Sequence, residues 1–461
     1  MKRPELLPRP VRQAGFAAVG LRNRIRRFGR EYRNWRKLLV VSDDWEPASR
    51  EAWQLHSLRT LLHTARTGTT HYRSLPGVRA ALEKRSLHEA LTQLPVLTKN
   101  ELRAHPESFQ NLNVPLSLET STSGSTGAPM MVGHDGCSIQ RRFAFLHDHL
   151  CRAESPPFAP SVRLSGRIFC RPGAVQRAPW LSNYAENQLF LSSYHLDAEH
   201  ADCIRKKLLT FRPVRMDGYP SAILSTLRLI EAHTSELPLR TVVTTAETLH
   251  PDIRREIEQL SNAKVLDYYA ASEGVPFIQQ CVAGIYHVRW QSGIFEVDTG
   301  SGISFSGDGE LICTSFVQAR TPLIRYRTGD LVSGLQIPVK NACSCGLTGP
   351  IVERVLGRVE DLIYTADGRS LGMFTYRTLK LIKGLGDTQV IQHTPTHFQV
   401  RTTTPTARSG DSLEMEIKET FERTLGYPIS LTVEFVERLP LGPNGKVRLV
   451  KSFVSPQSPA T

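Results

Sequence analysis

The sequence has no apolar stretch that could cross a membrane and too few cysteines for a disulfide framework. Its apolar runs stay well short of the roughly 18 residues that a membrane-spanning helix requires. Eight cysteines among 461 residues are too sparse to hold a chain of this length together. No apolar signal-peptide core follows the basic start of the chain. We therefore expect a cytoplasmic protein.

Acidic residues are scarce at the N-terminus. Between Met1 and Val40, 12 Lys or Arg stand against Glu5 and Glu31, a net of +10 out of the formal +13 for the whole chain. Because the rest of the chain is nearly balanced, we expect no nucleic-acid partner. Apolar residues at helical spacing between Val19 and Leu39 predict one basic amphipathic helix. This helix either packs one side on the main domain, which we favour, or docks onto a membrane or an acidic partner.

The length and the pattern of the chain predict more than one domain. Single cores stop growing at roughly 250–300 residues, and the middle of the chain alternates apolar strands with helical stretches, which favours an α/β fold. Strands are expected at 242–245, 265–269 and 310–313, and helices at 222–233 and 251–260. Beyond residue 357, strands at 390–403 and 429–436 flank a helix at 412–425. We predict a basic extension (1–40), a large multi-sheet α/β domain (41–356) and a small α+β domain (357–461).

The stretch Ser121–Pro129 reads STSGSTGAP and contains neither a charge nor a large side chain. Closely spaced glycines let backbone N–H groups approach an anion, and hydroxyls add further donors, so a polyphosphate fits this composition. A P-loop would need Lys after its last glycine, whereas Ala128 follows Gly127, which disfavours an ordinary P-loop NTPase. A solvated loop remains the alternative.

Four further segments give this loop a context: YYAASE (268–273), RYRTGD (325–330), LGRVED (356–361) and LPLGPNGK (439–446). In this order, the five segments resemble the motifs of adenylate-forming enzymes, and the chain from 53 to 454 looks most like the phenylacetate–CoA ligase branch with its CapK-like relatives. The resemblance implies a large domain and a small mobile domain. It also implies activation of a carboxylic acid, small or aryl, by ATP and Mg²⁺, and transfer of the acyl group to a thiol, first of all coenzyme A.

Two alternatives stay open within this resemblance. The acceptor could be the pantetheine of a carrier protein or an amine, as in polysaccharide or natural-product biosynthesis. The chain could also be a non-catalytic relative that only binds, although a binding scaffold has no reason to keep the whole set of motifs.

The resemblance also assigns roles to individual residues. It gives phosphate contacts to the loop and to Ser272, the adenine stack to Tyr269, Mg²⁺ to Glu273 and the ribose to Asp330. Arg325 is a further candidate nucleotide contact. Arg358 would approach the ribose or phosphate beside a hinge at Glu360 or Asp361, and Lys446 would bridge the acid carboxylate and the α-phosphate. The phosphate contacts in the loop are Ser123, Gly124, Ser125, Thr126 and Gly127.

Every one of these motifs lies beyond Thr120. We therefore expect that removal of residues 1–37 leaves adenylation largely intact. The segments Asp217–Ser221 and Thr244–Glu247 are candidate walls of the acid pocket, with packing as the alternative.

Three of the cysteines and one histidine form a candidate metal site. Cys343 and Cys345 share one tight turn, and Cys281 and His287 flank an expected hairpin at Ala283-Gly284. Three sulfurs and one nitrogen suit a tetrahedral structural zinc, and relatives of the branch carry similar arrangements. Incidental thiols are the alternative.

Overall fold

The structure is a computed structural model that divides into two compact units. Unit 1 comprises Met1–Thr328 and Val332–Val355, and unit 2 comprises Gly329–Leu331 and Leu356–Thr461. Within the described part of the chain, no helix is both long and apolar enough to pass through a bilayer. The structure describes residues 8–122, 130–167, 169, 178–336, 343–358, 363–366, 370–371, 379, 382, 385, 388–403, 410–440 and 448–454.

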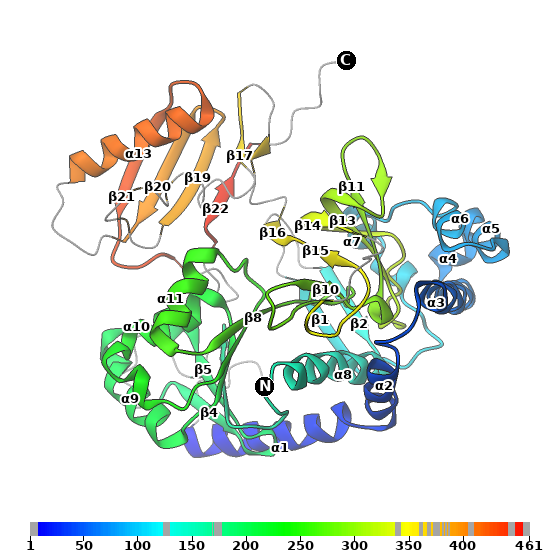
Figure 1. Cartoon of the computed structure of the whole chain (residues 1–461), viewed down its shortest axis with the longest axis horizontal. Coiled ribbons are helices and arrows are strands. Elements are labelled where there is room, and N and C mark those ends of the chain that lie inside the picture. Colours follow the sequence, from blue (N-terminus) through cyan, green and yellow to red (C-terminus); the bar gives the residue numbers. More distant parts are fainter. Residues whose placement is uncertain are drawn as a thin grey trace. The chain divides into compact units, whose positions relative to one another are not determined.

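A nine-stranded sheet forms the centre of unit 1 (Figure 1), and five of its neighbouring strands, β5-β3-β6-β7-β8, run parallel. Helices α9 (Ala198–Phe211), α10 (Pro220–Leu229) and α11 (Pro251–Ser261) are the crossovers between consecutive parallel strands. In sheet order the strands are β15 (Ile351–Val352), β10 (Tyr286–Val288), β9 (Ile278–Gln280), β8 (Lys264–Tyr269), β7 (Thr241–Thr245), β6 (Arg215–Gly218), β3 (Ser161–Ser165), β5 (Gln188–Ser192) and β4 (Trp180–Asn183).

Alternation along the strands divides the side chains between two cores. Val242 faces the apolar cluster that contains Ile204, Leu227 and Ile257 of the crossover helices. Its neighbour Val243 faces the opposite cluster, which includes Phe145 of α8 (Gly136–Arg152). Successive side chains of a strand point to opposite faces, so both faces of this sheet are covered. This explains why the predicted strands read as continuous apolar runs.

The other part of unit 1 is built on a five-stranded sheet and a group of N-terminal helices. Leu58, Leu62 and Tyr72 from the helices share a core with Phe295 and Leu311 from the sheet. The strands, in sheet order, are β12 (Ile303–Ser304), β11 (Gly293–Asp298), β13 (Gly307–Ser315), β14 (Tyr326–Leu335) and β16 (Arg354–Arg358). The helices are α3 (Pro47–Gly68), α4 (Thr70–Ser74), α5 (Pro76–Glu83), α6 (Leu87–Thr92) and α7 (Lys99–Ala104).

The basic N-terminus forms two helices, α1 (Arg9–Arg27) and α2 (Arg30–Val41), so the expectation of one continuous helix was wrong. The chain breaks at Gly29, where a Cβ would meet the side-chain amide of Gln140 at 2.7 Å. That amide oxygen in turn accepts a hydrogen bond from Tyr32 N at 3.2 Å. The break between the two helices therefore lies against α8, at the side chain of Gln140.

Unit 2 is a small α+β unit in which α13 (Gly410–Leu425) packs on a four-stranded sheet. Phe421 of the helix contacts Phe398 edge to face, with ring centroids 5.5 Å apart. The predicted strand at 390–403 is two antiparallel strands joined by a tight turn. In sheet order the strands are β21 (Ser430–Phe435), β20 (His397–Thr402), β19 (Thr388–Thr394) and β22 (Val450–Ser452), and a separate pair comprises β17 (Ile363–Tyr364) and β18 (Ser370–Leu371). The predicted fold class is confirmed by this architecture.

Candidate functional site

The glycine- and hydroxyl-rich loop is the connection of a hairpin in unit 1. Strands β1 (Leu118–Thr122) and β2 (Met130–His134) pair antiparallel, with Thr122 opposite Met130. The residues on the two sides of the loop are therefore paired strands. The phosphate contacts predicted within the loop, Ser123, Gly124, Ser125, Thr126 and Gly127, lie outside the described residues.

A chain of hydrogen bonds joins this hairpin to the segment that carries Glu273. The amide nitrogen of Gln318 lies 2.9 Å from His134 Nδ1 and 3.1 Å from the Gly133 carbonyl oxygen. Because the amide nitrogen can only donate, Nδ1 accepts and the proton of the ring lies on Nε2. His134 Nε2 lies 2.8 Å from Thr120 Oγ1, and the Thr120 hydroxyl donates to the Ser272 carbonyl oxygen at 3.3 Å.

Burial and the nearby Arg142 lower the pKa of His134 to about 4. The ring is therefore neutral, as this series of hydrogen bonds requires. The sequence reasoning missed Thr120, His134 and Gln318. Only the position of His134 at the end of the apolar strand that follows the loop could have drawn attention to it.

Glu273 is buried, with 3% of its surface exposed, and lies where the hairpin meets the end of β8. The Ser272 hydroxyl donates to its Oε2 at 3.4 Å. Arg142 of α8 donates to the Ala271 carbonyl oxygen at 3.4 Å. Burial lowers the pKa of Arg142, whereas Tyr268 and Glu273 act in the opposite direction. A carboxylate that is buried close to a cation is suited to bind a charged ligand.

The two tyrosines of this segment have different environments. Tyr268 is buried against Phe277, with ring centroids 5.8 Å apart and an interplanar angle of 26°. Tyr269, the last residue of β8, is only partly buried and packs beside Phe295. The structure thus leaves Tyr269, the residue proposed to stack on adenine, as the more accessible of the two rings.

Asp330 and Arg358 lie together in unit 2. Asp330 is 8% exposed on β14, and Arg358 at the end of β16 places its Nε 3.5 Å from Asp330 Oδ1. The structure therefore brings two residues from different predicted motifs into one ion pair. Glu360, Asp361 and Lys446 lie outside the described residues.

Arg325 does not take the role predicted for it. Its side chain is buried and pairs with Glu296 through Nε and Nη2, at 3.0 and 2.9 Å. Its remaining amino group, Nη1, donates to the carbonyl oxygens of Leu91 and Leu94 at 3.2 and 2.7 Å. Since all of these nitrogens bond within the protein, Arg325 fastens helix α6 to the five-stranded sheet, and we withdraw the nucleotide contact. Arg327 is likewise structural, because it bridges Asp298 and Glu310.

The candidate walls of the acid pocket meet each other. The backbone N–H of Ser221 donates to Glu247 Oε2 at 3.2 Å, which joins the two predicted segments. Asp217, however, pairs with Arg215 at 2.8 Å, and Thr244 is fully buried and donates to Asp267 at 2.8 Å. These two side chains therefore serve packing.

The four predicted metal ligands lie in one cluster of unit 1. The ligand atoms of Cys281, His287, Cys343 and Cys345 are all within 4.8 Å of one another. Cys281 Sγ lies 3.8 Å from Cys343 Sγ, and His287 Nε2 lies 3.4 Å from Cys345 Sγ. Around a tetrahedral zinc with Zn–S of about 2.3 Å and Zn–N of about 2.0 Å, two sulfurs lie about 3.8 Å apart, and a sulfur and a nitrogen lie about 3.5 Å apart. The residues therefore fit a tetrahedral ion.

The cysteines occupy two similar turns. Gly284 N donates to the Cys281 carbonyl oxygen and Gly346 N to that of Cys343, each at 2.9 Å. Both glycines have positive φ, of 84° and 80°, which other residues rarely adopt. Cys281 and Cys343 are thus each the first residue of a Cys-x-x-Gly turn.

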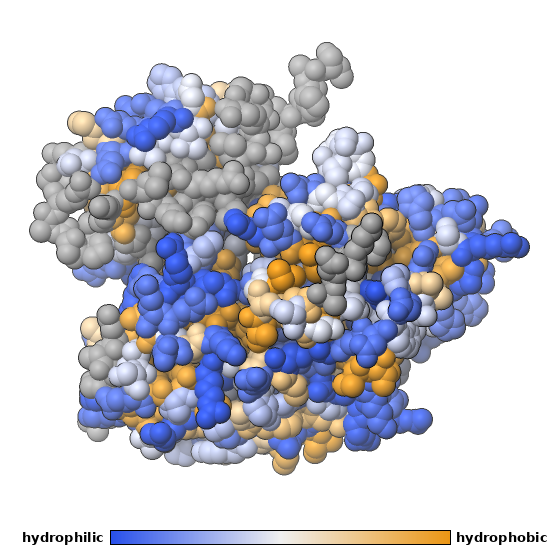
Figure 2. Space-filling view, viewed as in Figure 1, coloured by the Kyte–Doolittle hydropathy of each residue, from blue (hydrophilic) through white to orange (hydrophobic). Residues whose placement is uncertain are grey.

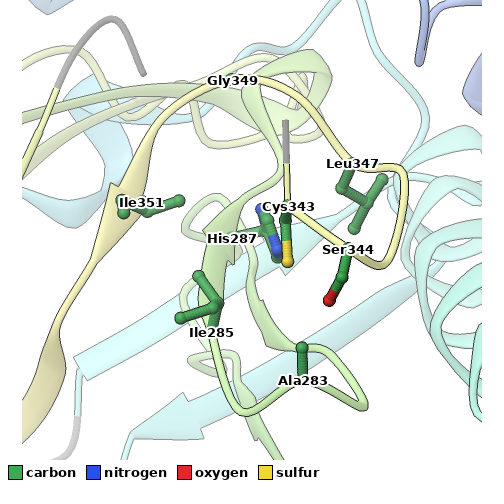
Figure 3. A pocket seen from close by; sticks show the side chains of 8 residues that line it. All are labelled: Ala283, Ile285, His287, Cys343, Ser344, Leu347, Gly349 and Ile351. Atoms are coloured by element: carbon green, nitrogen blue, oxygen red, sulfur yellow. The ribbon is translucent and has the colours of Figure 1, made fainter. Parts of the chain in front are cut away.

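Figure 3 shows the sulfur of Cys343 beside the ring of His287, next to a pocket of about 390 Å³. Burial, followed by the charges of Arg289 and Arg152, lowers the pKa of His287 to about 4, so the ring is neutral and able to bind a metal at neutral pH. Its buried Nδ1 has no hydrogen-bond partner among the residues that the structure describes. The described residues that line this pocket include no member of the ATP motifs, which distinguishes the pocket from the site around Glu273.

The chain is similar in sequence to CapK and in both sequence and fold to known CoA ligases. Residues 363–453 match the family described as the CapK C-terminal domain. The protein CapK of Staphylococcus aureus is 27% identical over 366 residues, which cover 78% of this chain and 79% of CapK. A phenylacetate-coenzyme A ligase of Thermus thermophilus is 24% identical over 371 residues, which cover 76% of this chain and 77% of the ligase.

Among solved structures, 2-hydroxyisobutyryl-CoA ligase in the postadenylation state has a TM-score of 0.70 at 18% identity, covering 89% of this chain and 91% of the ligase. This likeness concerns the fold, and it spans both units. The chain therefore has the fold of an adenylate-forming CoA ligase, matches the CapK C-terminal domain over residues 363–453, and is similar in sequence to CapK and to the phenylacetate-coenzyme A ligases.

Proposed function

We propose that this protein is an AMP-forming acid–thiol ligase. It activates a small or aryl carboxylic acid with ATP as the acyl-adenylate and passes the acyl group to coenzyme A. The observation that carries the proposal is the hydrogen-bond chain from Gln318 through His134 and Thr120 to Ser272. These hydrogen bonds hold the β1–β2 hairpin, which carries the candidate phosphate loop, beside the segment of the buried Glu273. The loop motif and the YYAASE motif, which are far apart in sequence, therefore meet at one place.

The chemistry assigns a task to each group. Glu273 offers oxygen ligands to Mg²⁺, a hard cation that neutralises phosphate charge when bound. The loop Ser123–Gly127 and Ser272 donate to the phosphates, and Tyr269 covers the adenine. Asp330 accepts hydrogen bonds from the ribose hydroxyls. Arg358 then leaves its ion pair with Asp330 and approaches the phosphates. Lys446 bridges the acid and the α-phosphate, and a flexible ammonium can leave again before thioester formation.

Coenzyme A is the acceptor that we favour, because both the phenylacetate-coenzyme A ligases and 2-hydroxyisobutyryl-CoA ligase are named for it. A carrier-protein pantetheine or an amine is the alternative acceptor that the sequence motifs leave open. Incubation of the acyl-adenylate with each acceptor and mass spectrometry of the product distinguishes them.

The test of adenylation is acid-dependent exchange of pyrophosphate into ATP across a panel of carboxylic acids. Glu273→Gln should reduce exchange with the best acid by at least about 100-fold, because the charge that holds the metal is lost. The matched control is Glu258→Gln, which changes a partly exposed carboxylate of α11 that pairs with Arg254 and should leave exchange unchanged. No exchange by the wild type with any acid, together with ATP binding, would favour the non-catalytic alternative.

We further propose that Cys281, His287, Cys343 and Cys345 hold a structural zinc. The support is the fit of the two ligand distances to a tetrahedral ion and the pair of matching Cys-x-x-Gly turns. With four protein ligands, the ion would have no open position for water. It would therefore join the β9–β10 hairpin to the 343–346 turn and take no part in the chemistry.

A further inference from the structure

The outward face of helix α1 carries a row of exposed aliphatic side chains. Val11, Leu21 and Ile25 are 52%, 57% and 74% exposed, and Val19 is 42% exposed. Exposed Ala18 lies between them, so Val11, Ala18, Leu21 and Ile25 recur at the spacing of one helix face, and Val19 lies to one side of it. Figure 2 shows apolar surface, interrupted by hydrophilic surface, along the lower edge of unit 1, where α1 lies in Figure 1.

The inward face of α1 is fixed to unit 1, which determines the direction of the outer row. Gln13 exchanges two hydrogen bonds with the backbone of Ser182, at 2.8 and 3.0 Å. Phe16 packs edge to face on Phe169 and Phe190, with centroids 5.8 and 5.1 Å apart. Arg27 pairs with Glu186 at 2.7 Å. The helix cannot roll to bury its aliphatic row without breaking these contacts.

The charge of this helix is entirely positive. Its sequence RPVRQAGFAAVGLRNRIRR contains six arginines and no acidic residue. Arg22 lies exposed within the aliphatic row, and Arg30 and Arg33 are exposed just beyond the helix. Long arginine side chains can extend sideways to phosphate groups while neighbouring aliphatic groups enter an apolar layer.

We propose that α1 docks unit 1 on an anionic lipid bilayer, lying in the plane of the interface with its aliphatic row inserted. An exposed apolar row alone would also suit a second copy of the chain. The positive charge decides between the two, because two copies of this face would bring like charges together, whereas anionic lipids attract exposed Lys and Arg side chains. The convex side of a single helix also offers no groove for a peptide.

The test is co-sedimentation of the full chain with vesicles of phosphatidylcholine that contain phosphatidylglycerol, and with vesicles of phosphatidylcholine alone. The wild type should bind only the anionic vesicles, and added salt should weaken binding. The double variant Leu21→Glu, Ile25→Glu should lower the affinity by about 100-fold or more, because it removes two aliphatic side chains from the apolar layer and adds two negative charges beside anionic lipids. Its melting temperature should match the wild type because both side chains are exposed.

Met415→Glu is the matched control, since Met415 is 64% exposed on α13 of unit 2. This variant should bind the anionic vesicles like the wild type. A wild type that does not bind anionic vesicles, or a double variant that binds as tightly as the wild type, overturns the proposal. A dimer of the wild type without vesicles that the double variant dissociates also overturns it, because a second copy would then cover the row.

Discussion

The guanidinium of Arg325 illustrates how a residue within a recognised motif can serve the fold alone. Glu296 is buried beside it, and removal of one partner of a buried ion pair leaves the other charge without compensation. We expect Arg325→Met to lower the free energy of unfolding by about 3–5 kcal/mol. Denaturant unfolding measures this, and the double variant with Glu296→Gln should recover part of the loss.

The KM for ATP distinguishes this role from a nucleotide contact. In the fraction of Arg325→Met that remains folded, the KM should stay near the wild-type value. A large rise in KM with unchanged stability would restore the nucleotide contact that we have withdrawn.

Lys446 remains a prediction from the sequence. Lys446→Ala should reduce acid-dependent pyrophosphate exchange by orders of magnitude, because adenylation needs a cation between the carboxylate and the α-phosphate. The same variant should still transfer the acyl group from a preformed acyl-adenylate to the acceptor thiol. Measuring the two half-reactions separately checks this, and an equal loss in both would contradict the role.

Among the elements, those with local signals agree best with the sequence. Thr98 and Glu101 form a reciprocal capping box at the start of α7, and a Thr followed three residues later by Glu is a signal that the sequence itself displays. Strands β7 and β8 were predicted within one residue of their ends. Caps and buried parallel strands depend on neighbouring residues and on hydrophobicity, which the sequence displays directly.

The elements that differ from expectation depend on distant contacts. The break between α1 and α2 lies where Phe28 packs on Phe143 and His147 of α8, more than 100 residues away in sequence. The polar chain through His134 and Gln318 likewise joins residues separated by 184 positions. No local pattern encodes such a partner, so sequence reasoning identified the motifs around Glu273 but not the groups that hold them together.

The two cysteine turns give a prediction for the zinc. Purified chain should contain about one zinc ion, and Cys343→Ser or Cys345→Ser should lose it, because three protein ligands bind zinc less tightly than four. Metal analysis measures the content, and the melting temperature should fall. Cys137→Ser, which changes an exposed thiol outside the cluster, is the control. Absence of zinc from protein purified without chelators would contradict the proposal.

At the scale of the whole molecule, the N-terminal helices belong to the core of unit 1. Leu39 of α2 is fully buried in the cluster that contains Phe145 and Tyr268. Arg36 pairs with Asp148 at 3.0 Å, and Asp148 also meets Arg152 and Arg289 at 2.8 and 3.2 Å. A segment that carries most of the net charge is thus also a structural part of the large unit, which composition alone could not reveal.

Removal of residues 1–37 should therefore destabilise the protein, contrary to what the position of the ATP motifs suggests. The truncation exposes the face of α8 that α2 covers, and it leaves the buried Asp148 without Arg36 and His147 without its 2.9 Å contact to the Tyr32 hydroxyl. Because Tyr268 at the start of the YYAASE segment packs in the same cluster, adenylation should fall together with the melting temperature. Truncation to residue 8 is the control, since it retains both helices. A 38–461 protein with the wild-type melting temperature and exchange rate would show that the helices are dispensable to the core.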